Sequence, residues 1–95
     1  MTKYELILIV KPNLTEADFK SLLDKVEGYL PSGEGHFLER DTWGKRRLAY
    51  PIDHNTEGFY AVLNFEAVGN ASGSLGEKLS LESDLIRYMI TKVAE

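Results

Sequence analysis

Cysteine is absent from all 95 residues of the chain. This absence excludes disulfides, thiol nucleophiles and cysteine metal sites, and it suits a reducing compartment such as the cytoplasm. No apolar run approaches the roughly 18 residues of a membrane span. The apolar run of residues 6–10 follows Glu5 and precedes no small-residue cleavage site, so a signal peptide is not expected. The sequence predicts a protein without a membrane partner.

An excess of basic residues is also missing. The chain has 11 Lys+Arg against 15 Asp+Glu, which gives a formal net charge of −4. A protein that binds nucleic acid on its own usually carries a strong basic excess. Three cations are nevertheless adjacent, at Lys45, Arg46 and Arg47. Any site for a polyanion is therefore expected to be local and to need help from another component.

The residue groupings of an active site are not found either. His36 and His54 have no partner at metal-ligand or triad spacing. Gly73 and Gly76 lack the flanking pattern of a nucleotide fingerprint, and no phosphate-cradling loop is present. No carboxylate pair stands in apolar surroundings that would split its proton affinities. The sequence predicts no enzyme, no metal, no cofactor and no small-molecule substrate.

The first third of the chain shows the periodicity of a strand followed by that of a helix. Residues 3–10 predict a central strand, because both of its faces are apolar. Thr15 is expected to cap a helix, with Asp18 three residues on. An apolar stripe at helical spacing follows from Phe19 to Leu30.

Two further strands are expected in the middle of the chain. Residues 35–52 predict a long strand in which Gly44 marks a bulge or bend. Pro51 cannot donate a ladder hydrogen bond, so this strand is expected at a sheet edge. Residues 53–58 predict a hairpin turn, and residues 59–68 predict the strand that follows it.

The last third predicts a short, marginal helix and a final strand at residues 84–93. The helix is expected over residues 70–81, capped by Asn70 or Ser72. Its two glycines each cost roughly 1 kcal/mol relative to alanine in a helix. The residues expected to pack inward are Val68, Leu75 and Leu79.

The order β-α-β-β-α-β predicts an α+β fold of the ferredoxin-like type, formed by residues 1–95 as a single domain. Such a fold is a four-stranded antiparallel sheet with two helices on one face, so the other sheet face is open. The apolar residues expected on that open face are Ile7, Ile9, Tyr60, Val62 and Met89. This face is either a partner surface or a passive one. Tyr60 is the main candidate for stacking a nucleobase, whereas most other aromatic residues are expected to be packing residues.

The three adjacent cations have two compatible interpretations. Guanidinium groups match phosphates and carboxylates, so Lys45, Arg46 and Arg47 predict a local site for an anion or an acidic partner. Charges on an edge strand also block the pairing of one sheet with another. An edge that charge keeps monomeric can still be covered by a chosen partner.

The segment WGKRRLAYPI at 43–52, followed by EGFY at 57–60, resembles the signature of the sixth protein of the bacterial small ribosomal subunit. The family pattern there is a glycine, a basic pair, Leu-Ala-Tyr-Pro-Ile, a short loop and then Gly-aromatic-aromatic. The beginning, YELILIVKPNLTE, resembles the opening strand and turn of the family, and LIRYMITK resembles its last strand. The similarity covers essentially the whole chain in the same order.

This resemblance implies a cytoplasmic ribosomal protein, monomeric when isolated, that binds the central domain of small-subunit ribosomal RNA. It implies binding together with the eighteenth protein of that subunit, a very basic chain that would supply much of the positive charge. On this reading, RNA contact falls to Lys3, Tyr60, Arg87 and Lys92. Contact with the protein partner falls to Trp43, Lys45, Arg46 and Arg47.

Two alternatives to this interpretation stay open. The sequence has Ser80, Glu82 and Ile86 where the family pattern leads us to expect some basic residues. These departures fit a redesigned scaffold that keeps the fold and binds no ligand. The other alternative is a small enzyme of the same fold, such as an acylphosphatase. The arginine-bearing phosphate loop of that family is missing, because residues 11–16 read KPNLTE.

Overall fold

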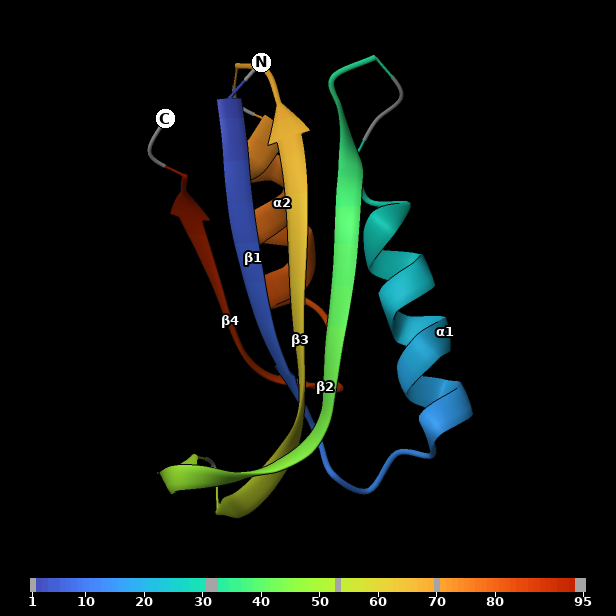
Figure 1. Cartoon of the computed structure of the whole chain (residues 1–95), viewed down its shortest axis with the longest axis vertical. Helices are drawn as coiled ribbons and strands as arrows, with labels where there is room; N and C mark the ends of the chain where they lie inside the picture. The colour runs from blue at the N-terminus through green and yellow to red at the C-terminus, as the bar shows by residue number, and fades with distance from the viewer. Residues whose placement is uncertain (1, 31–32, 53, 70, 94–95) are drawn as a thin grey trace.

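A computed structural model of the chain describes residues 2–30, 33–52, 54–69 and 71–93. The six elements follow the predicted order (Figure 1). They are β1 (Thr2–Val10), α1 (Glu16–Glu27), β2 (Gly35–Ile52), β3 (Asn55–Ala67), α2 (Ala71–Ser80) and β4 (Leu85–Lys92). No helix in these described ranges is long and apolar enough to cross a membrane.

The strands form one antiparallel sheet in the order β2-β3-β1-β4. This order confirms the ferredoxin-like prediction, with β1 and β3 in the centre and β2 at one edge. Gly44 lies at a positive φ of 77°, next to a shift in the β2–β3 register between Thr42 and Gly44. The predicted bulge is therefore present, and Trp43 is the extra residue that it inserts.

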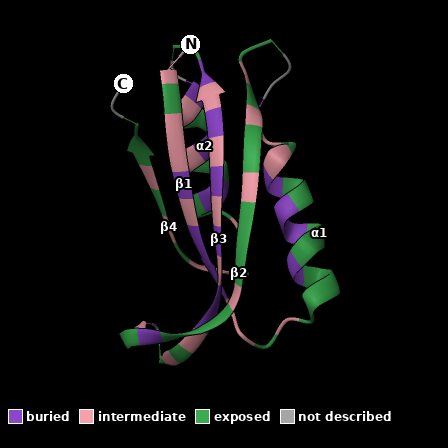
Figure 2. Cartoon of the chain, viewed as in Figure 1, coloured by how far each residue is buried: buried purple, intermediate pink, exposed green. Residues whose placement is uncertain are grey.

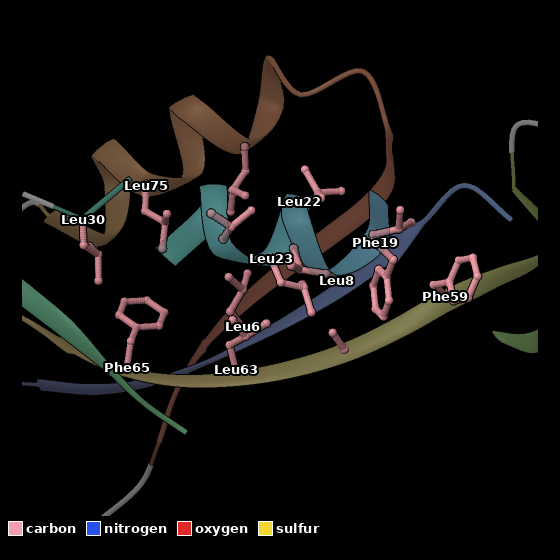
Figure 3. Packing of buried hydrophobic residues seen from close by; sticks show 14 of the residues in the cluster. Leu6, Leu8, Phe19, Leu22, Leu23, Leu30, Phe59, Leu63, Phe65 and Leu75 are labelled. Carbon is pink, nitrogen blue, oxygen red and sulfur yellow. The ribbon is translucent and has the colours of Figure 1, made fainter. Parts of the chain in front are cut away.

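The core lies between the sheet and the two helices, which cover the same sheet face (Figure 3). Alternate residues of the central strands point into it, so β1 and β3 are buried on one side and partly exposed on the other (Figure 2). The rings of Phe19 and Phe59 stack at 4.8 Å at one end of the core, and those of Tyr4 and Phe65 stack at 5.1 Å towards the other. The largest fully buried side chains are Phe65, Leu6, Leu8, Leu23, Leu63, Leu75, Leu79, Val10 and Val26.

The first helix begins as the sequence predicts. The hydroxyl of Thr15 accepts a hydrogen bond from the backbone N–H of Asp18, at 3.1 Å. The helix ends at Glu27, earlier than the apolar stripe to Leu30 implied, because Gly28 closes the last turn with its N–H on the carbonyls of Asp24 and Lys25. Leu30 is still buried in the core.

Ion pairs fasten this helix to the edge strand. The guanidinium of Arg40 donates from Nε to the carboxylate of Glu27 and from Nη2 to that of Asp24, both at 2.7 Å. Arg40 pairs with Leu63 across the sheet, on the helix-covered side. Arg40, for which the sequence alone predicted no function, therefore holds β2 against α1.

Three details of the second half differ from the sequence prediction. β3 already begins at Asn55, so the hairpin turn is shorter than residues 53–58. His54 takes a positive φ of 67° in it, and Asp53 lies outside the described residues. Ser72 lies inside α2 and does not cap it, while Asn70 is not among the described residues. Val68 is 39% exposed, so it does not pack inward, whereas Leu75 and Leu79 do.

The β2–β3 hairpin is much longer than the rest of the sheet, and its far end bends. Figure 1 shows this end turning away from the sheet axis towards the side of β4. A Cβ added at Gly58 would lie 2.7 Å from a methyl group of Ile9 and 3.1 Å from the carbonyl oxygen of Val10. Only a glycine allows β3 to approach β1 this closely at the bend.

Candidate nucleic-acid interface

One row of residues crosses the open face of the sheet near its bent end. The pairing register places Gly44 next to Tyr60, Tyr60 next to Ile9, and Ile9 next to Arg87. Paired residues of adjacent strands project to the same face. Two of the four residues that the sequence allotted to RNA, Tyr60 and Arg87, are therefore brought to the same row, with Ile9 between them.

The other two predicted RNA contacts lie elsewhere. Lys3 is on the open face but at the opposite end of the sheet, where it pairs with Glu66. Lys92 pairs with Tyr4, whose ring stacks in the core, so its side chain leaves β4 on the helix-covered side. Lys3 and Lys92 are close along the sheet, since the N–H of Val93 bonds to the carbonyl of Lys3. The four predicted RNA contacts therefore lie in two separate groups, at opposite ends of the sheet.

The bent hairpin encloses a hollow of about 280 Å³ against the open face. All four strands contribute to its lining, which includes Ile7, Ile9, Leu48, Tyr50, Tyr60 and Met89. Leu48 is only 7% exposed, although it lies outside the main core. Met89 is 47% exposed, so the hollow stays accessible from solvent. This hollow is the feature of the site that sequence reasoning missed.

The hairpin is tied across the sheet at the rim of the hollow. Nη1 of Arg87 donates a hydrogen bond to the phenol oxygen of Tyr50, at 3.2 Å. Tyr50 belongs to β2 and Arg87 to β4, the two outer strands. The bond therefore joins one edge of the sheet to the other over the open face.

The predicted partner contacts of β2 do not share one surface. Trp43 is half exposed, and its ring stacks near that of Tyr60, with centroids 6.3 Å apart. The ammonium of Lys45 lies 5.3 Å from the ring centroid of Phe59, on the helix-covered side. Arg46 and Arg47 are exposed, and they pair in register with Gly58 and Glu57 on β3. Because Arg46 and Arg47 are consecutive, they point to opposite sides of the strand.

Three carboxylates lie on the open face between the hollow and the end that carries Lys3. Glu39 and Glu5 both pair with Asn64, so two carboxylates flank one amide across three strands. Asp41 pairs with Val62 in the next row and accepts a hydrogen bond from the indole N–H of Trp43, at 3.1 Å. We call Glu5, Glu39 and Asp41 the carboxylate patch. None of them has a cationic partner within the described part of the chain.

Glu82, one of the residues found where basic residues were expected, makes contacts that stabilise the fold. Its carboxylate accepts a hydrogen bond from the Tyr29 hydroxyl at 3.1 Å and pairs with the Lys25 ammonium at 2.8 Å. The hydrogen bond from Lys25 is the main reason that the pKa of Glu82 is lowered. Burial, followed by the bond to Glu82, raises the pKa of Tyr29. Glu82 thus fastens α1 to the end of α2.

Metal ligation has no support within the described ranges, where no group of three His, Asp or Glu side chains converges. The imidazole Nε2 of His36 lies 3.4 Å from a carboxylate oxygen of Glu66 at the edge of the sheet, and this contact joins two side chains only. What the site offers is a partly apolar hollow, a stacked aromatic pair, one guanidinium and a patch of carboxylates.

Known proteins match this chain over its full length. A family profile described as "Ribosomal protein S6" matches residues 3–92. The small ribosomal subunit protein bS6 of Symbiobacterium thermophilum is 38% identical over 95 residues, covering 100% of both chains. That of Dictyoglomus turgidum is 40% identical over 91 residues, covering 96% of this chain and 94% of its own.

A solved structure matches the fold. The crystal structure of 30S ribosomal protein S6 from Thermotoga maritima superimposes with a TM-score of 0.89 at 24% identity. The match covers 97% of this chain and 87% of the other. The profile match and the two relatives confirm the resemblance drawn from residues 43–60. The chain belongs to the ribosomal protein S6 family of the bacterial small ribosomal subunit.

Proposed function

We propose that this protein is a structural component of the small ribosomal subunit in the cytoplasm. In this role it binds the central domain of small-subunit ribosomal RNA together with the basic eighteenth protein of that subunit, and it performs no catalysis. Membership of the family supports the ribosomal part of this proposal. The need for a second, basic protein rests on the charge distribution of this chain.

The separation of the cations carries the proposal. Lys3 and Lys92 lie at one end of the sheet, whereas Arg46, Arg47 and Arg87 lie at the other, around the bent hairpin. The carboxylate patch lies between these ends on the open face. Cations that neutralise phosphates supply a large share of the affinity of a protein for nucleic acid. A surface of this kind gives weak RNA binding alone, so the basic protein is expected to supply the missing charge.

Binding of the RNA with and without the basic protein tests this proposal. A fluorescently labelled central-domain RNA fragment is titrated with this protein alone, with the eighteenth protein alone, and with an equimolar mixture. We expect the mixture to bind at least tenfold more tightly than either protein alone. The isolated chain is expected to sediment as a monomer.

Two results would contradict the proposal. Tight RNA binding by this protein alone would show that no basic partner is needed. Equal binding by the mixture and by the eighteenth protein alone, with the chain shown to be folded, would instead favour a scaffold that has lost its ligands.

A further inference from the structure

We propose that the end of the β2–β3 hairpin is a strap that detaches from the open face of the sheet and docks on it again as one unit. The strap consists of residues 45–52 and 54–57. The structure holds it in the docked state, turned over the sheet towards β4 (Figure 1). In the detached state the strap leaves the sheet while the rest of the fold stays intact. The proposal concerns the isolated chain and does not depend on the proposed function.

The two strands of the hairpin each have a glycine at the base of the strap. Gly44 of β2 takes a positive φ of 77°, and Gly58 of β3 pairs with Arg46, two residues farther along β2. Without a Cβ, a glycine can change φ and ψ at little steric cost. The pairing of β1 with β3 ends close to this level, at Val10 and Phe59. The two glycines therefore form a hinge between the strap and the four-stranded sheet.

The β2–β3 ladder is interrupted inside the strap. The pairs that flank the interruption are Arg47–Glu57 and Ile52–Asn55. Residues 48–51 of β2 therefore stand opposite a single residue of β3, outside the regular ladder. This segment depends mainly on its side chains for its place over the sheet.

Two side chains of the segment 48–51 dock the strap. Leu48 lines the hollow and is 7% exposed, whereas Ala49 and Pro51 are exposed. Tyr50 accepts the hydrogen bond from Nη1 of Arg87, at 3.2 Å. A segment with few buried apolar contacts opens at a lower free energy than global unfolding requires. One buried leucine and one exposed hydrogen bond therefore predict a strap that detaches locally.

Ile9 shows what the docked strap covers. Ile7 and Ile9 belong to the same strand and both face away from the helices, but Ile7 is partly exposed and Ile9 is only 9% exposed. The base of the strap touches Ile9, since a Cβ added at Gly58 would lie 2.7 Å from its methyl group. Exposed apolar patches promote aggregation. The docked strap therefore shields apolar surface of the free protein, and detachment uncovers it.

Amide hydrogen exchange of the isolated chain tests whether the strap opens independently. The protected amides of the strap should share one opening free energy. Urea should change their exchange much less than that of β1 amides, because detachment exposes little surface. The β1 amides are expected to exchange only through global unfolding.

Two truncations of buried side chains separate detachment from global unfolding. Leu48→Ala removes the anchor of the strap, whereas Val26→Ala truncates a fully buried side chain of α1. We expect Leu48→Ala to speed the exchange of the strap amides at least about tenfold. Val26→Ala should speed the exchange of β1 amides and leave that of the strap within about twofold, because the two sites are independent. Circular dichroism checks that both variants fold.

A cross-link tests the docked state directly. The chain has no cysteine, so Tyr50→Cys with Arg87→Cys gives two unique thiols at the ends of the cross-sheet hydrogen bond. One sample is bridged with a flexible bifunctional maleimide, and the control is the same variant with each thiol capped by N-ethylmaleimide. Bridging should slow the exchange of the strap amides at least about tenfold relative to the capped chain.

The inference would be overturned if the strap amides exchanged as slowly as those of β1, accelerated equally in Val26→Ala, or did not respond to Leu48→Ala. Strap amides without protection in the unaltered chain would show that the strap is not docked in solution. Failure of the two thiols to be bridged, or equal exchange in the bridged and capped samples, would show that detachment does not separate Tyr50 from Arg87. Every measurement uses the isolated chain, so none of these results bears on the proposed function.

Discussion

The guanidinium of Arg87 on β4 donates a hydrogen bond to the phenol oxygen of Tyr50 on β2, 3.2 Å away across the open face. The two residues are 37 positions apart in the sequence, and their strands form opposite edges of the sheet. They meet because the end of the β2–β3 hairpin bends over the sheet. The bond therefore marks the contact between the bent hairpin and the strand it reaches.

Removal of this bond is expected to loosen the hairpin without unfolding the protein. Tyr50 is 59% exposed, so the hydrogen bond competes with water. Tyr50→Phe should lower the free energy of unfolding by less than about 1 kcal/mol. Faster amide exchange at residues 48–50 and at Ile52, with unchanged exchange in β1, would confirm the local effect. A uniform change over the whole sheet would contradict it.

Leu48 is expected to be the main apolar anchor of the bent hairpin. It is 7% exposed, and truncation of a buried leucine to alanine costs about 2–5 kcal/mol. Since Leu48 borders an open hollow, we expect Leu48→Ala to cost about 2 kcal/mol, measured by urea unfolding. Leu81→Ala is the control, because Leu81 is 85% exposed and its loss should cost less than about 0.5 kcal/mol. Equal costs for both variants would show that the hairpin is not anchored by Leu48.

Substitution by alanine should change the free energy of unfolding in opposite directions at two glycines. A Cβ at Gly73 would meet no atom within 4 Å, and Gly73 lies inside α2. Gly73→Ala should therefore raise the free energy of unfolding by about 0.5–1 kcal/mol. Gly58→Ala should lower it by more than that, because its Cβ would collide with Ile9 and the backbone of Val10. Thermal unfolding of both variants tests the two signs, and a stabilising Gly58→Ala would refute the close approach at the bend.

The link between Glu82 and Lys25 predicts a pH dependence of stability. Its hydrogen bond with Lys25 lowers the pKa of Glu82 from the ordinary value of 4.5, so the unfolded chain binds the proton more tightly than the folded one. The stabilisation by the Glu82–Lys25 pair is therefore fully present above about pH 4.5, and it is lost as the pH falls through the lower pKa of the folded state. Glu82→Gln should cost about 1 kcal/mol at pH 7, since Lys25 is mostly exposed, and markedly less near pH 3.

Urea unfolding at the two pH values measures this difference. The matched control is Glu77→Gln, which changes an exposed carboxylate of α2 that has no ion pair in the described part of the chain. It should show no such difference. An equal cost of Glu82→Gln at both pH values would contradict the role of its charge.

Much of the fold follows from local signals in the sequence. The two apolar faces of residues 3–10 identified a central strand, Thr15 identified the helix start, and Gly44 identified the bulge. Gly44 predicted a bulge or bend in the strand, but the turning of the hairpin end over the open face was not predicted, because periodicity reports which residues alternate and not how far a strand curves. Gly58 was the available signal, since an isolated glycine in a strand pattern indicates a close backbone approach.

The site was less predictable than the fold, because it depends on strand register. Arg87 and Lys92 were grouped as cations of one strand, yet their odd separation of five places them on opposite faces. The alternation of β4 alone was sufficient to separate them. Glu5, Glu39 and Asp41 come from two strands that share no direct pairing, so only the register with β3 brings them together. The role of Glu82 likewise depends on Lys25 and Tyr29, more than 50 residues earlier.

The dependence of RNA affinity on salt is the most direct test of the claim that the partner supplies the positive charge. The slope of log K against log[salt] is about −0.9 for each phosphate neutralised on a duplex. We predict that the complex of the two proteins binds central-domain RNA more tightly than the eighteenth protein alone, but with a slope steeper by no more than about two units. The reason is that two of the cations predicted to contact RNA, Lys3 and Lys92, lie away from the hairpin end. A slope for this protein alone as steep as that of the complex would contradict the account.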